Sequence, residues 1–151
     1  MISRKRQTAG PAKVAETVED NRGRPEVIIE FLFDRGFFHI CVRNIGDRPA
    51  VGISTRFNKK ITGLGGRKEI STLPLFRNIE FLGPGREIVM LLDASDSYFS
   101  RKQPTKISVQ ITYSDSEKTK YEATINHDLE IYRELPYLAR SEHNCVDRTA
   151  D

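Results

Sequence analysis

Short segments of this chain alternate apolar and polar residues, and this two-residue period constrains the fold more than any other feature of the sequence. In TKISVQITYS (105–114) every second residue from Ile107 to Tyr113 is apolar, and the residues between them are polar. Successive side chains of a β-strand point to opposite faces, so the pattern predicts a strand with one buried face. Related patterns occur at 27–34, 37–44, 50–57, 78–82, 86–92 and 119–128, and a short strand is expected near 68–71.

Residues suited to turns separate these segments. In NIGDRP (44–49), Gly46 can adopt positive φ and Pro49 has no N–H to give to a sheet. Asn44 and Asp47 carry short polar side chains that bond to nearby backbone. Every residue type here has a turn-forming reason to be present. We therefore interpret the segment as a crossing between two strands and not as a catalytic loop.

About seven strands in roughly 100 residues, with short turns and almost no helix, are typical of an antiparallel immunoglobulin-like β-sandwich. A closed barrel is the main alternative. The break at 44–49 and the irregular segment 58–77 favour the sandwich, because its chain must cross between two sheets. The predicted fold class is all-β.

The periodic region also sets the domain boundaries. Residues 1–25 lack periodic hydrophobicity and contain glycine and proline, so we expect a disordered basic tail. The sandwich is predicted over residues 26–135, and residues 136–151 are expected to be a polar C-terminal tail.

One motif resembles a known family. The string F-x-I-x-V-x-N-I-G-x-x-P-A covers residues 38–50; Leu-Gly-Pro-Gly follows at 82–85, and V-x-I-x-Y-x-D at 109–115. Together they resemble the immunoglobulin-like modules of the CARDB (cell-adhesion-related) type found in bacteria and archaea, over about residues 26–128. The resemblance implies a sandwich fold, a bacterial source, and an accessory binding or spacer role.

The charge distribution argues against a nucleic-acid platform. The net charge is +3, and residues 1–25 contain six basic and three acidic residues, so residues 26–151 are neutral overall. Arg4, Lys5 and Arg6 form only a small basic cluster, and the folded region offers no interleaved aromatic residues to stack bases. We do not expect nucleic acid to be a partner.

Composition also bears on the cellular location. No apolar run approaches the roughly 20 residues that span a bilayer, and no apolar stretch follows the basic N-terminal residues as in a secretory signal. Cys41 lies in a strand pattern and Cys145 in the predicted tail, so both are expected to be free thiols. We predict a cytoplasmic protein without a transmembrane segment.

The sequence offers little for catalysis. His39, His127 and His143 are the only histidines, and the Gly-x-Ser-x-Gly motif of a nucleophile elbow is absent. Ligand spacings typical of zinc sites are also absent. We predict a protein that is not an enzyme and has no catalytic residues, metal or cofactor.

A ligand-binding alternative stays open. The glycine-rich loop 63–68 could offer N–H groups and positive charge to an anion, and Asp93 and Asp96 lie in a loop that could bind calcium. With His127, these residues would form a small-ligand, calcium or anion-binding domain with hydrolytic capacity. The loop lacks the P-loop spacing, and the acidic segment lacks the glycine and distal glutamate of an EF-hand.

The preferred site is apolar. Leu64, Leu73, Leu75 and Phe76 lie in the irregular segment, where they either plug one end of the sandwich or stay exposed as a partner site. Unpaired sheet edges offer a second route to a partner. We predict a non-enzymatic module that binds a protein partner or a second copy of itself through a sheet edge or segment 64–76.

Overall fold

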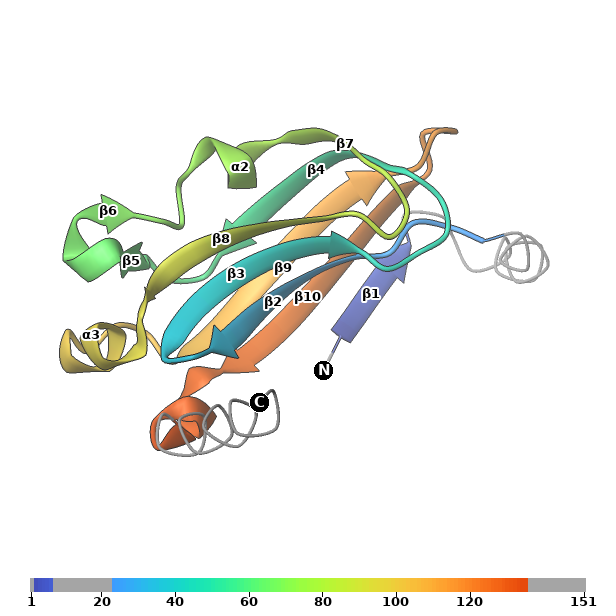
Figure 1. Cartoon of the computed structure of the whole chain (residues 1–151). Helices are drawn as coiled ribbons and strands as arrows, with labels where there is room; N and C mark the ends of the chain where they lie inside the picture. Colours follow the sequence, from blue (N-terminus) through green and yellow to red (C-terminus); the bar gives the residue numbers. More distant parts are fainter. Residues whose placement is uncertain (1, 7–22, 136–151) are drawn as a thin grey trace, which may run out of the picture.

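The computed structural model describes residues 2–6 and 23–135 (Figure 1). The elements in chain order are β1 (Ile2–Arg6), β2 (Val27–Asp34), β3 (Phe37–Asn44), β4 (Ala50–Phe57), β5 (Thr62–Gly63), the 3-10 helix η1 (Leu64–Gly66), β6 (Lys68–Glu69), α2 (Pro74–Arg77), β7 (Ile79–Leu82), β8 (Glu87–Ala94), α3 (Ser95–Ser100), β9 (Lys106–Ser114), β10 (Lys120–Asp128) and the 3-10 helix η2 (Leu129–Tyr132). None of the described helices is long and apolar enough to cross a membrane.

Two antiparallel sheets pack face to face. One has the strand order β1-β10-β9-β4-β7, and the other has the order β2-β3-β8. Figure 1 shows the two layers, with α3 and η2 at one end of them. The short strands β5 and β6 pair only with each other. The predicted all-β antiparallel sandwich is confirmed.

The alternation seen in the sequence marks the buried layer. Ile107, Val109, Ile111 and Tyr113 of β9 are all buried, as are the alternate residues of β10 from Tyr121 to Ile125. The opposite layer contributes apolar residues of β2, β3 and β8 to the same core cluster. Side chains that leave water in this way provide the main favourable free energy of folding.

The strand order differs from that of an immunoglobulin constant domain in one respect. In a constant domain the fourth strand lies beside the fifth, in the sheet of the first two strands. Here the corresponding strand, β7, pairs with β4 in the other sheet. The chain therefore changes sheets within residues 83–86, between β7 and β8. The immunoglobulin likeness beyond the sandwich architecture stays a prediction.

The prediction that residues 1–25 lack structure is wrong for residues 2–6. These residues form β1, which pairs antiparallel with β10 from Ile2 opposite Ile125 to Arg6 opposite Tyr121. Sequence periodicity gave no sign of this strand, because main-chain pairing to a sheet edge does not require an apolar pattern. The rest of the predicted tails, residues 7–22 and 136–151, lies outside the described residues.

Asn44 holds the crossing that interrupts the sequence at NIGDRP. Its side chain is fully buried. Its Oδ1 accepts hydrogen bonds from the N–H groups of Glu26 (3.1 Å) and Gly46 (3.0 Å). Its Nδ2 donates to the carbonyl oxygens of Arg48 (2.8 Å) and Leu82 (3.1 Å). One amide thus joins the start of β2, the 44–49 turn and the end of β7, so the turn has a structural role.

Close packing completes this crossing. A Cβ atom on Gly46 would lie 2.2 Å from the carbonyl oxygen of Arg24, so a larger residue would force the backbone apart. The main chain of Asn44 is bonded as well: its N–H donates to Arg86 O (3.0 Å), and its carbonyl accepts from Gly85 N (2.9 Å).

Replacing Asn44 should destabilise the fold strongly. Asn44→Ala leaves several buried backbone groups without partners, so we expect it to lower the free energy of unfolding by about 2–4 kcal/mol. Asn58→Ala is the matched control, because Asn58 Oδ1 accepts a single bond from Ser108 N (2.9 Å) at the surface. That change should cost less than about 1 kcal/mol. Urea unfolding measures both, and equal losses would contradict the role assigned to Asn44.

Candidate functional site

The apolar residues of segment 64–76 are buried or half-buried. Phe76 is 1% exposed, and its ring packs edge-to-face on Phe57 at 4.9 Å between centroids. Leu73 and Leu75 pack against the same core cluster, and Leu64 is half-buried. Of the two alternatives stated for these residues, the structure therefore favours the plug over an exposed apolar patch.

The glycine-rich loop and Asp93 do lie together, but they bond to each other. Gly65 N–H donates to Asp93 Oδ1 at 3.1 Å, and Asp93 Oδ2 forms an ion pair with Arg101. Arg101 also donates to Thr62 Oγ1 (2.7 Å) and Thr62 O (3.2 Å). Asp93 is buried, so its charge is compensated inside the protein. This cluster anchors the β5–β6 hairpin and α3 to β8, and both oxygens of the carboxylate are engaged.

Asp96 and His127 do not join this cluster. Asp96 is exposed in the first turn of α3. His127 belongs to β10 in the other sheet, where its ring packs edge-on against Phe31 at 4.9 Å between centroids. In the described ranges 2–6 and 23–135, no group of three or more His, Cys, Asp or Glu residues could hold a metal ion. Of the residues of the ligand-binding alternative, the glycine-rich loop and Asp93 thus lie together, whereas Asp96 and His127 have separate surroundings.

The side chain of His127 is half-buried. Its Nε2 is buried without a hydrogen-bond partner among the described residues. Burial lowers the pKa of His127 below its ordinary value of 6.5, although a hydrogen bond to the backbone of Ile29 acts in the opposite direction. The imidazole is therefore held neutral between the two sheets.

Cys41 is the one free cysteine within the described residues, and it is buried in β3. Burial, followed by the nearby carboxylates of Glu87 and Glu30, raises the pKa of its thiol to about 11. A thiol that stays protonated at neutral pH is a poor nucleophile. The other predicted free thiol, Cys145, lies outside the described residues, as does His143.

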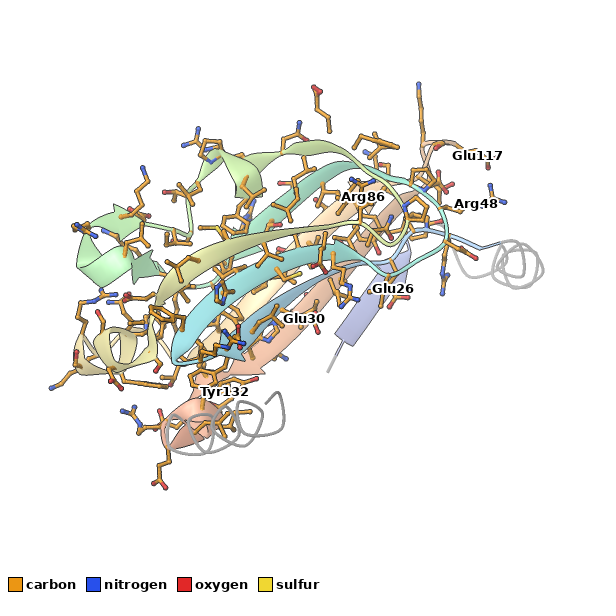
Figure 2. The ribbon with its side chains drawn as sticks, viewed as in Figure 1. Glu26, Glu30, Arg48, Arg86, Glu117 and Tyr132 are labelled. Atoms are coloured by element: carbon orange, nitrogen blue, oxygen red, sulfur yellow. The ribbon has the colours of Figure 1, made fainter. Side chains whose placement is uncertain are left out.

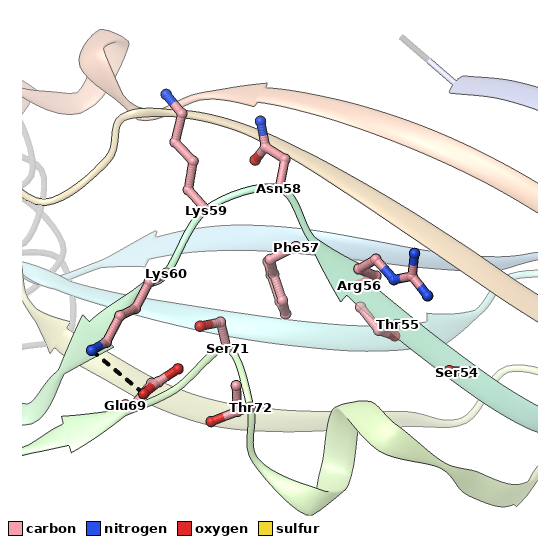
Figure 3. A pocket seen from close by; sticks show the side chains of 10 residues that line it. All are labelled: Ser54, Thr55, Arg56, Phe57, Asn58, Lys59, Lys60, Glu69, Ser71 and Thr72. Carbon is pink, nitrogen blue, oxygen red and sulfur yellow. Dashed lines mark ion pairs between the residues drawn. The ribbon is translucent and has the colours of Figure 1, made fainter.

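A polar groove borders the end of β4. Two hollows of about 370 and 440 Å³ share Asn58 and Lys59. Figure 3 shows the first hollow, where Lys60 turns to Glu69 (3.7 Å). Charged, hydroxyl and amide side chains line most of it, whereas small-molecule sites are mostly lined by apolar groups. The groove therefore lacks the mostly apolar lining of a typical small-molecule site.

The outer face of the sheet β2-β3-β8 is unusually apolar. Strand pairing places Leu32, His39 and Leu91 in one cross-strand row and Glu30, Cys41 and Val89 in the next. Four apolar residues of this sheet are about half exposed: Leu32 (37%), Phe37 (46%), Val89 (45%) and Leu91 (42%). We call these four residues the apolar face. His39 lies between Leu32 and Leu91 in their row, and Phe37 lies between Asp34 and Ala94. Exposed apolar surface is a feature of interaction sites in soluble proteins.

The outer face of the other sheet is polar along β9 and β10. Its outward positions are Ser108, Gln110, Thr112, Glu122, Thr124 and Asn126. Cross-strand hydrogen bonds join Ser108 to Asn126 and Gln110 to Glu122. In the described part, the half-exposed apolar residues of this sheet are Val51 of β4 and Phe81 of β7, which lie opposite each other. The two outer faces therefore differ in chemistry.

Sequence reasoning overlooked the apolar face, although a signal was present. β2 (VIIEFLFD) and β8 (EIVMLLDA) carry apolar residues on both of their faces, although Glu30, Asp34 and Glu87 also lie on the outward one. Strands that are apolar on both faces usually lie between two layers. Here nothing in the described part covers the second face.

Acid should destabilise the fold through His127. The unfolded histidine titrates near pH 6.5 and the folded one at a lower pH, so the unfolded chain binds more protons as the pH falls below about 6.5. The stabilisation is complete above that pH and is lost as the pH falls. We expect His127→Phe to reduce the loss of stability between pH 7 and pH 5, measured by urea unfolding at each pH. Asn126→Ala, an exposed neighbour, should leave the slope unchanged; an unchanged slope in His127→Phe would contradict the assignment.

Comparisons with known proteins place the chain in a family but add no function. No curated protein matches it, and no solved structure matches it. One family model, described as a domain of unknown function (DUF8453), matches residues 2–133, from β1 through η2. The CARDB resemblance of the motif stays an interpretation. Because the match covers most of its length, the chain belongs to the DUF8453 family of domains of unknown function.

Proposed function

We propose that this chain is a non-enzymatic protein-interaction module that binds through its apolar face, and that its partner is a second copy of the chain. The observation that carries the proposal is the contrast between the two outer faces. One sheet exposes Leu32, Phe37, Val89 and Leu91, whereas the other is polar along β9 and β10.

The arrangement around the apolar face supports a protein partner. Beside it, Arg43 lies between Glu30 (3.7 Å) and Glu87 (3.5 Å), so the charges next to the apolar residues are already paired (Figure 2 labels Glu30). An apolar centre with a polar rim is the usual anatomy of a protein interface. β2 and β8 are also the outermost strands of their sheet in the described part.

A second copy of the chain is the partner that we propose for this surface, because it brings an identical apolar face to the interface. A twofold interface uses one self-complementary patch on both subunits. Full burial of a Val, Leu or Phe side chain contributes about 1.5–3 kcal/mol, so half-exposed side chains can still gain roughly 1 kcal/mol each. Association costs about 4–15 kcal/mol, so four such side chains per copy support a weak dimer, not an obligate one.

The surroundings of the candidate reactive groups support the non-enzymatic part of the proposal. Asp93 is engaged by Gly65 and Arg101, and His127 is packed against Phe31. The ligand-binding alternative built on these residues gains no support from their placement. The free, protonated thiol of Cys41 agrees with a reducing compartment, and we infer a cytoplasmic location.

Charges on the apolar face should abolish self-association. We expect sedimentation equilibrium between about 10 and 500 µM to show a monomer–dimer equilibrium for the wild-type chain. Weak affinity of this kind is typical of transient interfaces that bury a small area. Val89→Lys/Leu91→Lys should raise the dissociation constant at least tenfold, because each lysine would have to be desolvated in the interface.

The matched control carries the same charges on the other outer face. Thr112→Lys/Asn126→Lys replaces exposed residues of β9 and β10 and should leave the dissociation constant unchanged. Thermal unfolding of each variant checks that it is folded. A wild-type chain that is monomeric throughout, or a control that weakens the dimer equally, would refute the second copy as the occupant.

A further inference from the structure

His39 is a titratable side chain at the centre of the apolar face. It belongs to β3, the middle strand of its sheet, between β2 and β8 (Figure 1). Strand pairing places His39 directly between Leu32 and Leu91. On β3 itself Phe37 comes two residues earlier on the same side, and Val89 lies in the next cross-strand row. The four residues of the apolar face therefore surround the imidazole, which is half-buried.

The charged groups that share this outer face are already paired. Apart from His39, the titratable and charged residues that β2, β3 and β8 place there are Glu30, Asp34, Cys41, Arg43 and Glu87. Arg43 lies 3.7 Å from a carboxylate oxygen of Glu30 and 3.5 Å from one of Glu87. The Cys41 thiol donates to Glu87 Oε1 at 3.8 Å, and Asp34 lies 4.0 Å from Arg35. A protonated His39 would therefore add a positive charge that no ion pair with a described residue compensates.

The symmetry of the proposed dimer brings the two histidines together. A twofold interface uses the same patch on both subunits, and the symmetry axis passes through that patch. A residue at the centre of the patch therefore lies near its own copy across the interface. Because the apolar side chains around it exclude water on association, two imidazolium ions there would lose hydration and repel each other. Two neutral imidazoles carry no such repulsion.

We propose that His39 is a pH-sensitive switch of self-association: the dimer forms while both His39 rings are neutral and dissociates when they take up protons. This switch rests on the proposed dimer and names the condition that controls it. Histidine is the side chain whose charge ordinarily changes between pH 5 and pH 8. The monomer binds protons that the dimer excludes, so a fall in pH shifts the equilibrium towards the monomer.

The test compares the dissociation constant of the full chain at about pH 8 and about pH 5.5 by sedimentation equilibrium. For the wild-type chain we expect at least a tenfold increase on acidification, because each dimer excludes two protons. His39→Gln keeps a polar side chain but does not titrate, so its dissociation constant should change less than twofold. His39→Lys is charged at both pH values and should bind at least tenfold more weakly than the wild-type chain at pH 8.

His127→Phe is the matched control, because His127 is the other histidine of the described residues and lies in the opposite sheet. Its dissociation constant should rise on acidification as much as that of the wild-type chain. Thermal unfolding at each pH checks that every variant is folded. A wild-type dissociation constant that is independent of pH, or a pH dependence that His39→Gln retains, would overturn the switch and leave the dimer standing. A chain that is monomeric at pH 8 would overturn both proposals.

NMR of the imidazole resonances in the wild-type chain gives a second readout that needs no substitution. Proton exclusion by the dimer should lower the pH at which half of the His39 rings are protonated, by at least about 0.3 between roughly 20 and 500 µM protein. The midpoint of His127, which lies outside the apolar face, should not depend on concentration. A His39 midpoint that stays constant while the chain dimerises would refute the switch, even if His39→Gln failed to fold.

Discussion

The buried amide of Asn44 is the interaction on which the arrangement of the two sheets most depends. Its four hydrogen bonds reach Glu26, Gly46, Arg48 and Leu82, which lie before β2, within the first crossing and at the end of β7. The main chain of Asn44 is hydrogen-bonded to Gly85 and Arg86, in the link between β7 and β8. Two of the links in which the chain changes sheets, β3 to β4 and β7 to β8, are therefore tied to one residue. The inward apolar residues of the two sheets form one core, and the alternate residues of each strand therefore lie on the outer faces.

Those outer faces differ because the strands differ. β9 and β10 alternate strictly, so they bury one side and present hydrogen-bonded polar pairs on the other. β2 and β8 are apolar on both sides, so burying one side leaves the other as an apolar surface. The charged groups that might suggest chemistry are used inside the protein: Asp93 with Arg101 is the clearest case. The exposed surfaces and edges of the two sheets are therefore the candidate interaction sites of the molecule.

Much of the architecture was predictable from the sequence because a buried strand leaves a two-residue period. The segments at β9 and β10 and the turn-forming residues at 44–49 all follow local rules. β1 was not predictable, because its pairing is made by backbone groups that every residue carries. The contact of Asp93 with the glycine-rich loop was not predictable either. It joins residues 28 positions apart, and only the fold brings Gly65 to the carboxylate.

The meeting of two sheet crossings at Asn44, from β3 to β4 and from β7 to β8, also limits how the length of the chain can vary. The atoms that Asn44 bonds in residues 44–49 and 82–86 are fixed by the number of residues in each link. One inserted residue in either link would move a carbonyl or an N–H away from its partner on the buried Asn44, and an unpaired buried polar group costs free energy. Members of the family should therefore keep these two links at constant length.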